Sequence, residues 1–118
     1  MHINYSSFEQ GDIVVANIAY SDFSEIKRRP VLVISSTEFN SNSGNIIALN
    51  ISSSKIKSKY DSALFNKDLT EGELLLESKI MADFPTTLSK NLVSQKIAKV
   101  SEKKLEEVKE KIRELYLI

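Results

Sequence analysis

Apolar residues in the first half of the chain are gathered into three short runs with polar stretches between them. They span Asp12–Ile18 after Gly11, then Val31–Ile34 and Asn45–Ile51, and each has the length and β-branched content of a strand. Short strands at close spacing are typical of a small barrel or a curled antiparallel sheet. Three weaker runs bring the expected total to five or six strands: Ser62–Phe65, Glu73–Met81 and Ser94–Lys99.

The polar stretches predict loops and turns. Ser21–Arg28 is mostly polar and is expected to form a long loop. It ends before Pro30, whose fixed φ and missing N–H suit the start of a strand or an edge position. Asn40–Gly44 has the composition of a turn between two strands.

The period of the pattern changes near the C-terminus. Apolar residues recur there every three or four positions, which places them on one stripe of a helix. Ser101 is the expected N-cap, and Val100 and Leu105 stand at the two positions of a hydrophobic staple. The stripe consists of Leu105, Val108, Ile112, Leu115 and Tyr116.

Length and composition bound the architecture. The chain has 118 residues, of which 42% are hydrophobic and 27% charged, so residues 1–118 are expected to form one globular domain. No apolar run approaches the ~20 residues of a membrane span, and the first ten residues lack the pattern of a secretory signal. A cytoplasmic protein without membrane contact is expected.

The residue types restrict the chemistry. The chain has no cysteine, and His2 is its single histidine. A thiolate nucleophile, a Cys-ligated zinc site, a His-pair nuclease and a Ser-His-Asp hydrolase within one subunit are therefore excluded. Any catalysis has to use carboxylates, hydroxyls, arginine or lysine.

Charge is balanced overall and uneven locally. Sixteen basic residues match sixteen acidic ones, so there is no global positive field for holding duplex DNA. Basic residues nevertheless gather in two clusters, which favours a local anion site. The clusters are Lys27, Arg28 and Arg29, and Lys55, Lys57 and Lys59.

Several of these segments, in this order, resemble the MazF/PemK toxin family. The resemblance implies an SH3-like, Kid-type curled antiparallel barrel with a C-terminal helix, usually a homodimer. It also implies an endoribonuclease that cuts single-stranded mRNA without a metal or other cofactor and is held inactive by a cognate antitoxin peptide. The matching segments are Gly11-Asp12-Ile13-Val14, Lys27-Arg28-Arg29-Pro30-Val31-Leu32-Val33-Ile34-Ser35, Ile51-Ser52-Ser53, and Ser78-Lys79-Ile80 through Asp83.

The resemblance also suggests site residues. Arg29 stands at the catalytic arginine of the family, and Ser52 stands where the family usually has a catalytic threonine. Glu25 lies in a loop where many members carry an acidic residue. Asp83 matches an aspartate of the family. Part of the family has an arginine two residues before that aspartate, and this sequence has Met81 at that position.

RNA transesterification needs a base for the 2′-hydroxyl and positive charge at the phosphorane. Arg29 suits the second role because its planar fork fits two phosphate oxygens. The Ser52 hydroxyl can donate to a phosphate oxygen, and Glu25 or Asp83 is the available base. Residues expected to bind RNA are Lys27, Arg28, Ser53, Lys55 and Lys57.

Two other functions stay open at this point. One is a non-enzymatic poison that binds a protein such as DNA gyrase through the same barrel, with the contact made by the C-terminal residues. The other is an inactive barrel that only binds RNA or protein, which Met81 and the serine in place of threonine keep open.

Overall fold

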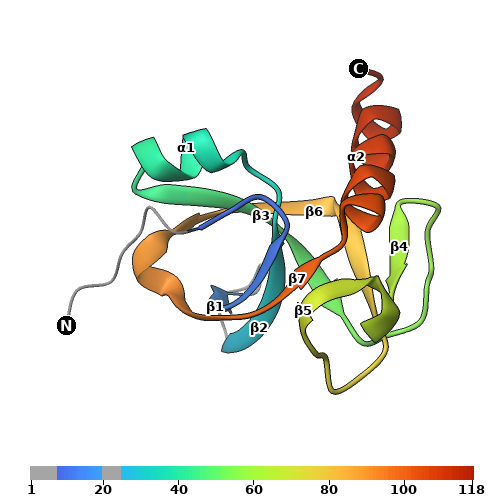
Figure 1. Ribbon diagram of the computed structural model, residues 1–118, viewed down its shortest axis with the longest axis horizontal. Helices are drawn as coiled ribbons and strands as arrows, with labels where there is room; N and C mark the ends of the chain where they lie inside the picture. The colour runs from blue at the N-terminus through green and yellow to red at the C-terminus, as the bar shows by residue number, and fades with distance from the viewer. Residues whose placement is uncertain (1–7, 20–24) are drawn as a thin grey trace.

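The computed structural model describes residues 8–19 and 25–118, and its strands form a single antiparallel sheet (Figure 1). Seven strands lie in the order β4-β6-β3-β2-β1-β7-β5, and the sheet curls strongly without closing. The expected mainly β fold with a C-terminal helix is confirmed, with seven strands in place of five or six and with open edges. The elements in chain order are β1 (Asp12–Ala19), β2 (Ile26–Val33), α1 (Thr37–Asn42), β3 (Asn45–Ser52), β4 (Asp61–Leu64), η2 (Asn66–Asp68), β5 (Leu69–Gly72), β6 (Ser78–Ser89), η3 (Lys90–Leu92), β7 (Val93–Val100) and α2 (Glu102–Tyr116).

Both faces of the sheet are buried, each in its own apolar cluster. Successive side chains of a strand point to opposite faces, so Val31 and Val33 of β2 join the cluster inside the curl, whereas Leu32 joins the other. The second cluster is covered by α2, which packs against β6 and contributes the buried Val108. Burial on both faces explains why β2 reads as a continuous apolar run from Val31.

The C-terminal helix begins at the expected cap. The Ser101 hydroxyl accepts the backbone N–H of Lys104 at 3.1 Å, and Leu105 and Ile112 pack against the second cluster. Tyr116, in contrast, is 55% exposed, because the last turn of α2 extends beyond the sheet (Figure 1). The apolar stripe is therefore buried at Val108, half-buried at Leu105, Ile112 and Leu115, and exposed at its end.

The predicted turn at Asn40–Gly44 is wrong, because the short helix α1 occupies much of this segment. The Ser36 hydroxyl caps α1 by accepting the N–H of Phe39 at 3.0 Å. The Asn40 side chain is buried, and its amide donates to the carbonyl oxygens of Phe8 and Ser35. Serine and asparagine favour helix caps as well as turns, so composition did not distinguish the two.

Two strand boundaries also differ from the prediction. Ile26–Arg28, expected in a loop, extend β2 because they pair with the end of β1, while residues 21–24 lie outside the described residues. Of the strand expected over Glu73–Met81, only Ser78–Met81 is strand, at the start of β6, and residues 73–77 form the loop that follows β5. At Gly72 the φ angle is +74°, and a Cβ atom there would lie 2.1 Å from the carbonyl oxygen of Ile97, so β5 ends there.

Pro30 lies inside β2, where it pairs with Val15 of β1. On its other side, β2 pairs with β3 only from Val31 onward. At Pro30, β2 therefore has no β3 residue paired with it, and a residue without an N–H is tolerated at such an edge position.

Candidate functional site

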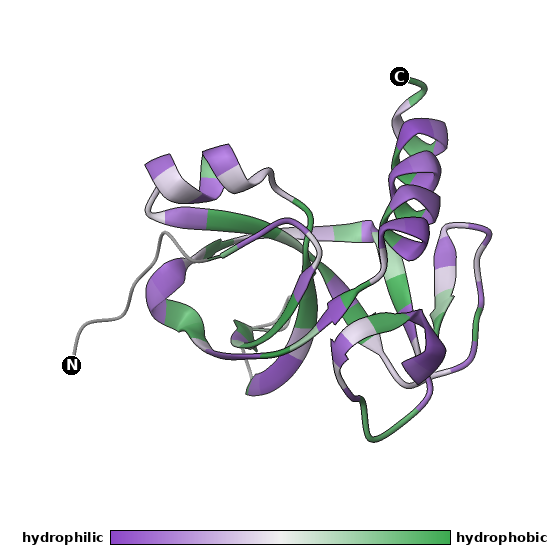
Figure 2. Ribbon diagram, in the orientation of Figure 1, coloured by the Kyte–Doolittle hydropathy of each residue, from purple (hydrophilic) through white to green (hydrophobic). Residues whose placement is uncertain are grey.

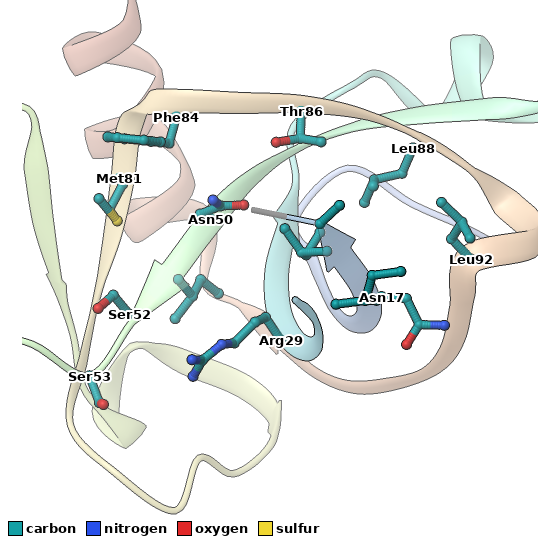
Figure 3. Close-up of a pocket in the computed structure, with 14 residues that line it drawn as sticks. Asn17, Arg29, Asn50, Ser52, Ser53, Met81, Phe84, Thr86, Leu88 and Leu92 are labelled. Carbon is teal, nitrogen blue, oxygen red and sulfur yellow. The ribbon is translucent and has the colours of Figure 1, made fainter. Parts of the chain in front are cut away.

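Arg29 and Ser52 lie on adjacent strands and reach one common pocket. Val31 of β2 pairs with Asn50 of β3, and this register, continued by two residues, sets Arg29 opposite Ser52. Both residues line a pocket of about 810 Å³ (Figure 3). Arg29 is exposed and its guanidinium points toward the side where Ser52 and Ser53 lie. The structure therefore places both residues in the lining of one pocket, and their catalytic roles stay a prediction.

The hydroxyl of Ser52 is oriented by the turn that follows β3. Its Oγ accepts the backbone N–H of Ser54 at 3.1 Å and lies 2.8 Å from the Ser54 hydroxyl. The N–H bond occupies one lone pair of the Ser52 oxygen, and the hydroxyl proton stays able to turn toward Ser54 or a bound anion. A phosphate oxygen beside Arg29 can thus receive a hydrogen bond from Ser52.

The pocket is apolar apart from a few polar groups. Arg29 is the single charged side chain among the described residues that line it. A mainly apolar wall with one cation and several amides and hydroxyls suits a ligand that is part anion and part aromatic ring. The lining residues are Asn17, Ile18, Ala19, Ile26, Arg29, Asn50, Ile51, Ser52, Ser53, Met81, Phe84, Thr86, Leu88 and Leu92.

The two candidate carboxylates lie outside this lining. Glu25 stands immediately before β2, is exposed, and pairs with Lys27 at 3.3 Å. Asp83 is exposed in β6, at a bulge where its neighbours Met81 and Phe84 turn toward the pocket. The structure therefore brings Arg29 and Ser52 together, while the assignment of the base stays a prediction.

Two of the five predicted RNA-binding residues, Ser53 and Arg28, line a pocket near Arg29. Ser53 lines the main pocket and also a second one of about 410 Å³. Arg28 lines only the second pocket and donates to the Ser94 hydroxyl at 2.9 Å. Lys27 lines neither; its side chain is exposed beside Glu25.

The second pocket is walled by an exposed apolar loop. Residues 74–76 between β5 and β6 are all leucine, and Leu75 and Leu76 are 96% and 66% exposed. Figure 2 shows this loop as a hydrophobic segment at the lower end of the molecule. Arg29, Ile51 and Ser53 line both pockets, so the two meet at the predicted catalytic arginine.

A buried ion pair, which the sequence reasoning missed, holds the loop after Ser52. The Lys79 ammonium lies 3.1 Å from Asp61, and their side chains are 3% and 2% exposed. Lys79 also donates to the carbonyl oxygen of Lys55 at 2.9 Å, and Asp61 accepts the backbone N–H of Lys57 at 2.9 Å. The backbone that carries the predicted RNA-binding residues Lys55 and Lys57 is thereby fixed, while both side chains stay exposed.

The environment of Asp61 favours its charged form. Burial alone would raise the pKa of Asp61, but the hydrogen bonds from the Lys57 N–H and the Lys79 ammonium outweigh it and lower the pKa below its ordinary value. In the sequence, Lys79 stands near the start of a matching segment and Asp61 lies two residues after Lys59, and neither position predicted an ion pair. Their separation of 18 positions left the contact invisible before folding.

Within the described residues, no three His, Cys, Asp or Glu side chains are grouped so that they could share a metal ion. In the same part of the chain, no helix has the length and apolar character needed to span a bilayer.

Comparison with protein families gives one match that covers most of the chain. Residues 9–116 match the family described as PemK-like, MazF-like toxin of type II toxin-antitoxin system. No curated protein sequence matches significantly.

Solved structures share the fold at low sequence identity. An endoribonuclease in complex with its cognate antitoxin from a mycobacterial species has a TM-score of 0.79 at 14% identity, covering 95% of this chain and 97% of that one. A MazE-MazF structure from Deinococcus radiodurans has a TM-score of 0.77 at 21% identity, covering 94% and 97%. The Mycobacterium tuberculosis toxin MazF-mt6 has a TM-score of 0.74 at 17% identity, covering 91% and 97%.

Proposed function

The chain belongs to the family of PemK-like and MazF-like toxins of type II toxin-antitoxin systems, and on this premise we propose that it is a metal-independent, sequence-specific endoribonuclease acting on single-stranded mRNA. The observation that carries the proposal is the meeting of Arg29 and Ser52 in one pocket that holds no other lining charge. Structural neighbours described as endoribonucleases support it at the level of the family.

The proposed reaction is a transesterification within the RNA. The 2′-oxygen attacks the adjacent phosphorus, the bond from phosphorus to the 5′-oxygen breaks, and the products are a 2′,3′-cyclic phosphate and a 5′-hydroxyl. A carboxylate, Glu25 or Asp83, accepts the 2′-hydroxyl proton, and the departing 5′-oxygen takes up a proton. Arg29 stabilises the charge that gathers on the phosphorane, and Ser52 donates to one of its oxygens.

The proposal is tested by incubating the purified protein with a long unstructured RNA in EDTA. We expect discrete fragments whose 5′-hydroxyl ends are substrates for polynucleotide kinase. Arg29→Ala should abolish the fragments, whereas Arg113→Ala, an exposed arginine on α2, should cut like the wild type. Intact RNA with the wild type, or normal cutting by Arg29→Ala, would contradict the proposal.

The proposed protein partner is an antitoxin segment that is acidic and amphipathic. Arg28 and Arg29 supply positive charge beside the second pocket, and the exposed Leu75 and Leu76 supply apolar contact. A peptide with alternating acidic and apolar side chains complements both features. Its binding would cover Arg29 and so inhibit cleavage, which a competition assay with labelled RNA measures.

A homodimer is proposed for the active form, since the edge strands β4 and β5 of the open sheet have no second strand partner within the described chain. Light scattering at micromolar concentration should give twice the mass of 13.3 kDa. The monomer mass with full ribonuclease activity would refute this.

A second candidate, the non-enzymatic protein poison, is favoured by the exposed C-terminus. Leu117 and Ile118 are 89% and 82% exposed. If this candidate holds, Arg29→Ala stays toxic to cells, and truncation of residues 115–118 removes the toxicity.

A further inference from the structure

A bulge in the pairing of β3 with β6 borders the main pocket. Leu49 of β3 pairs with Pro85 of β6, yet Ile51, only two residues on, pairs with Ile80. The segment Met81–Phe84 therefore faces the single residue Asn50. Extra residues in one strand interrupt the ladder and redirect side chains, and such bulges are frequent beside active sites.

Opposite this bulge, the side-chain oxygen of Asn50 has no hydrogen-bond partner among the described residues. This atom, Oδ1, is buried, although Asn50 lines the pocket. Buried acceptors without a partner are rare in folded proteins and call for an explanation. Figure 3 shows the Asn50 amide between the Met81 and Phe84 side chains and that of Thr86.

The position of Asn50 relates it to the phosphate site. Asn50 and Ser52 are two residues apart on β3, a separation of about 6.7 Å along a strand. Asn50 also pairs with Val31, two residues beyond Arg29. A phosphate held by Arg29 and Ser52 thus has its own nucleoside within reach of the Asn50 amide.

The surroundings of Asn50 suit a flat aromatic ring. Phe84 is 50% exposed and lines the pocket together with Met81 and Leu88. Unpaired bases in RNA are recognised by stacking on such side chains and by hydrogen bonds to the base edges that pairing would otherwise cover. An asparagine amide, with one acceptor and two donors, is a common reader of those edges.

We infer that the pocket binds the nucleobase next to the scissile phosphate and that Asn50 is the residue that selects it; this rests on the proposed ribonuclease function. The recessed Oδ1 accepts a hydrogen bond from an exocyclic amino group, which projects farther from the ring than an imino N–H. Adenine, cytosine and guanine carry such a group and uracil does not. The enzyme therefore discriminates against uracil at one position adjoining the cut.

The test uses synthetic single-stranded RNA oligonucleotides around a mapped cleavage site, with each of the four bases placed in turn at the two flanking positions. For the wild type we expect kcat/KM to be at least tenfold lower with uracil at one of the two positions. Asn50→Leu should cut all four substrates at similar rates. Thr87→Val, an exposed β-strand residue that lines neither pocket, is the matched control and should keep the wild-type preference.

Thermal unfolding separates recognition from a structural role. Leucine removes an unsatisfied buried acceptor and retains a similar volume, so Asn50→Leu should melt at the wild-type temperature or above it. Lost discrimination with retained stability supports the inference. The inference is overturned if Asn50→Leu cuts RNA and keeps the discrimination against uracil, or if it loses activity together with a lower melting temperature. Both outcomes leave the proposed function intact. A wild type that cuts no RNA overturns both the inference and the proposed function.

Discussion

The buried pair of Lys79 and Asp61 permits a quantitative prediction about stability. Lys79→Met removes the ammonium and leaves the Asp61 carboxylate inside the protein, where its side chain is 2% exposed. The Asp61 carboxylate still accepts the backbone N–H of Lys57. The carbonyl oxygen of Lys55 loses its hydrogen bond from Lys79. An uncompensated buried charge of this kind costs about 3–5 kcal/mol.

This cost is large compared with the stability of a domain of this size. For 118 residues the free energy of unfolding is expected to be about 6–18 kcal/mol. A loss of about 3–5 kcal/mol corresponds to a fall in melting temperature of roughly 10–20 °C. The variant should still fold at room temperature, so the measurement is feasible.

The assay is urea unfolding followed by circular dichroism at neutral pH. The dependence of the unfolding free energy on urea concentration should be the same for the wild type and the variants, so that a change in midpoint reports a change in stability. Asp61→Asn combined with Lys79→Met makes the pair neutral and keeps an acceptor for the Lys57 N–H, so it should recover much of the loss. Lys27→Met is the matched control, because Lys27 and Glu25 are 44% and 56% exposed and such a pair contributes about 0–1 kcal/mol.

The reasoning fails if Lys79→Met costs less than about 1 kcal/mol, which is the range of a solvent-screened pair. It also fails if the double variant is less stable than Lys79→Met alone. In the first case, the pair would have to be hydrated in solution.

Two further predictions concern the site, and a third concerns the pH dependence of folding stability. Arg29→Lys should lower kcat/KM about a hundredfold, because losing an oriented contact to the transition state costs on the order of 3 kcal/mol and a lysine lacks the bidentate fork; near-normal cleavage of a fluorogenic RNA would reject that geometry. Ser52→Ala should lose most activity and keep the fold, while Ser52→Thr should retain activity; an equally active alanine variant would shift the role to Ser53. The pKa of Asp61 is lowered in the folded state, so its contribution to stability is complete above the unfolded pKa of about 3.9 and is lost as the pH falls through the lower folded value. Urea midpoints should therefore fall more steeply with acid in the wild type than in the neutral double variant, and equal slopes would contradict the assignment.

Fixing the loop after Ser52 connects stability with the proposed activity. The proposed contact of Lys55 and Lys57 with RNA requires an ordered backbone, and the Asp61 and Lys79 contacts hold this backbone in place. Lys79→Met should accordingly raise KM for RNA more than it lowers kcat. Arg29 and Ser52 belong to paired strands outside that loop.

Local pattern alone determined the elements whose signals lie within a few residues. The helix cap at Ser101, the staple of Val100 and Leu105, and the strand from Val31 were predictable because capping and period depend on neighbouring side chains. The choice of Arg29 and Ser52 came from the family resemblance and from their spacing on two adjacent predicted strands, whereas the pairing register between those strands was not predicted.

Only the tertiary structure decided the contacts that join distant segments. The β2–β3 register brings Arg29 to the same pocket as Ser52, and the bulge in β6 lies opposite Asn50, whose buried Oδ1 has no hydrogen-bond partner in the described part of the chain. Lys79 meets Asp61 because β4 and β6 pair with each other. Pairing register and bulges depend on the whole sheet and not on any one strand, so a local pattern that predicts each strand correctly still leaves open which side chains those strands bring together.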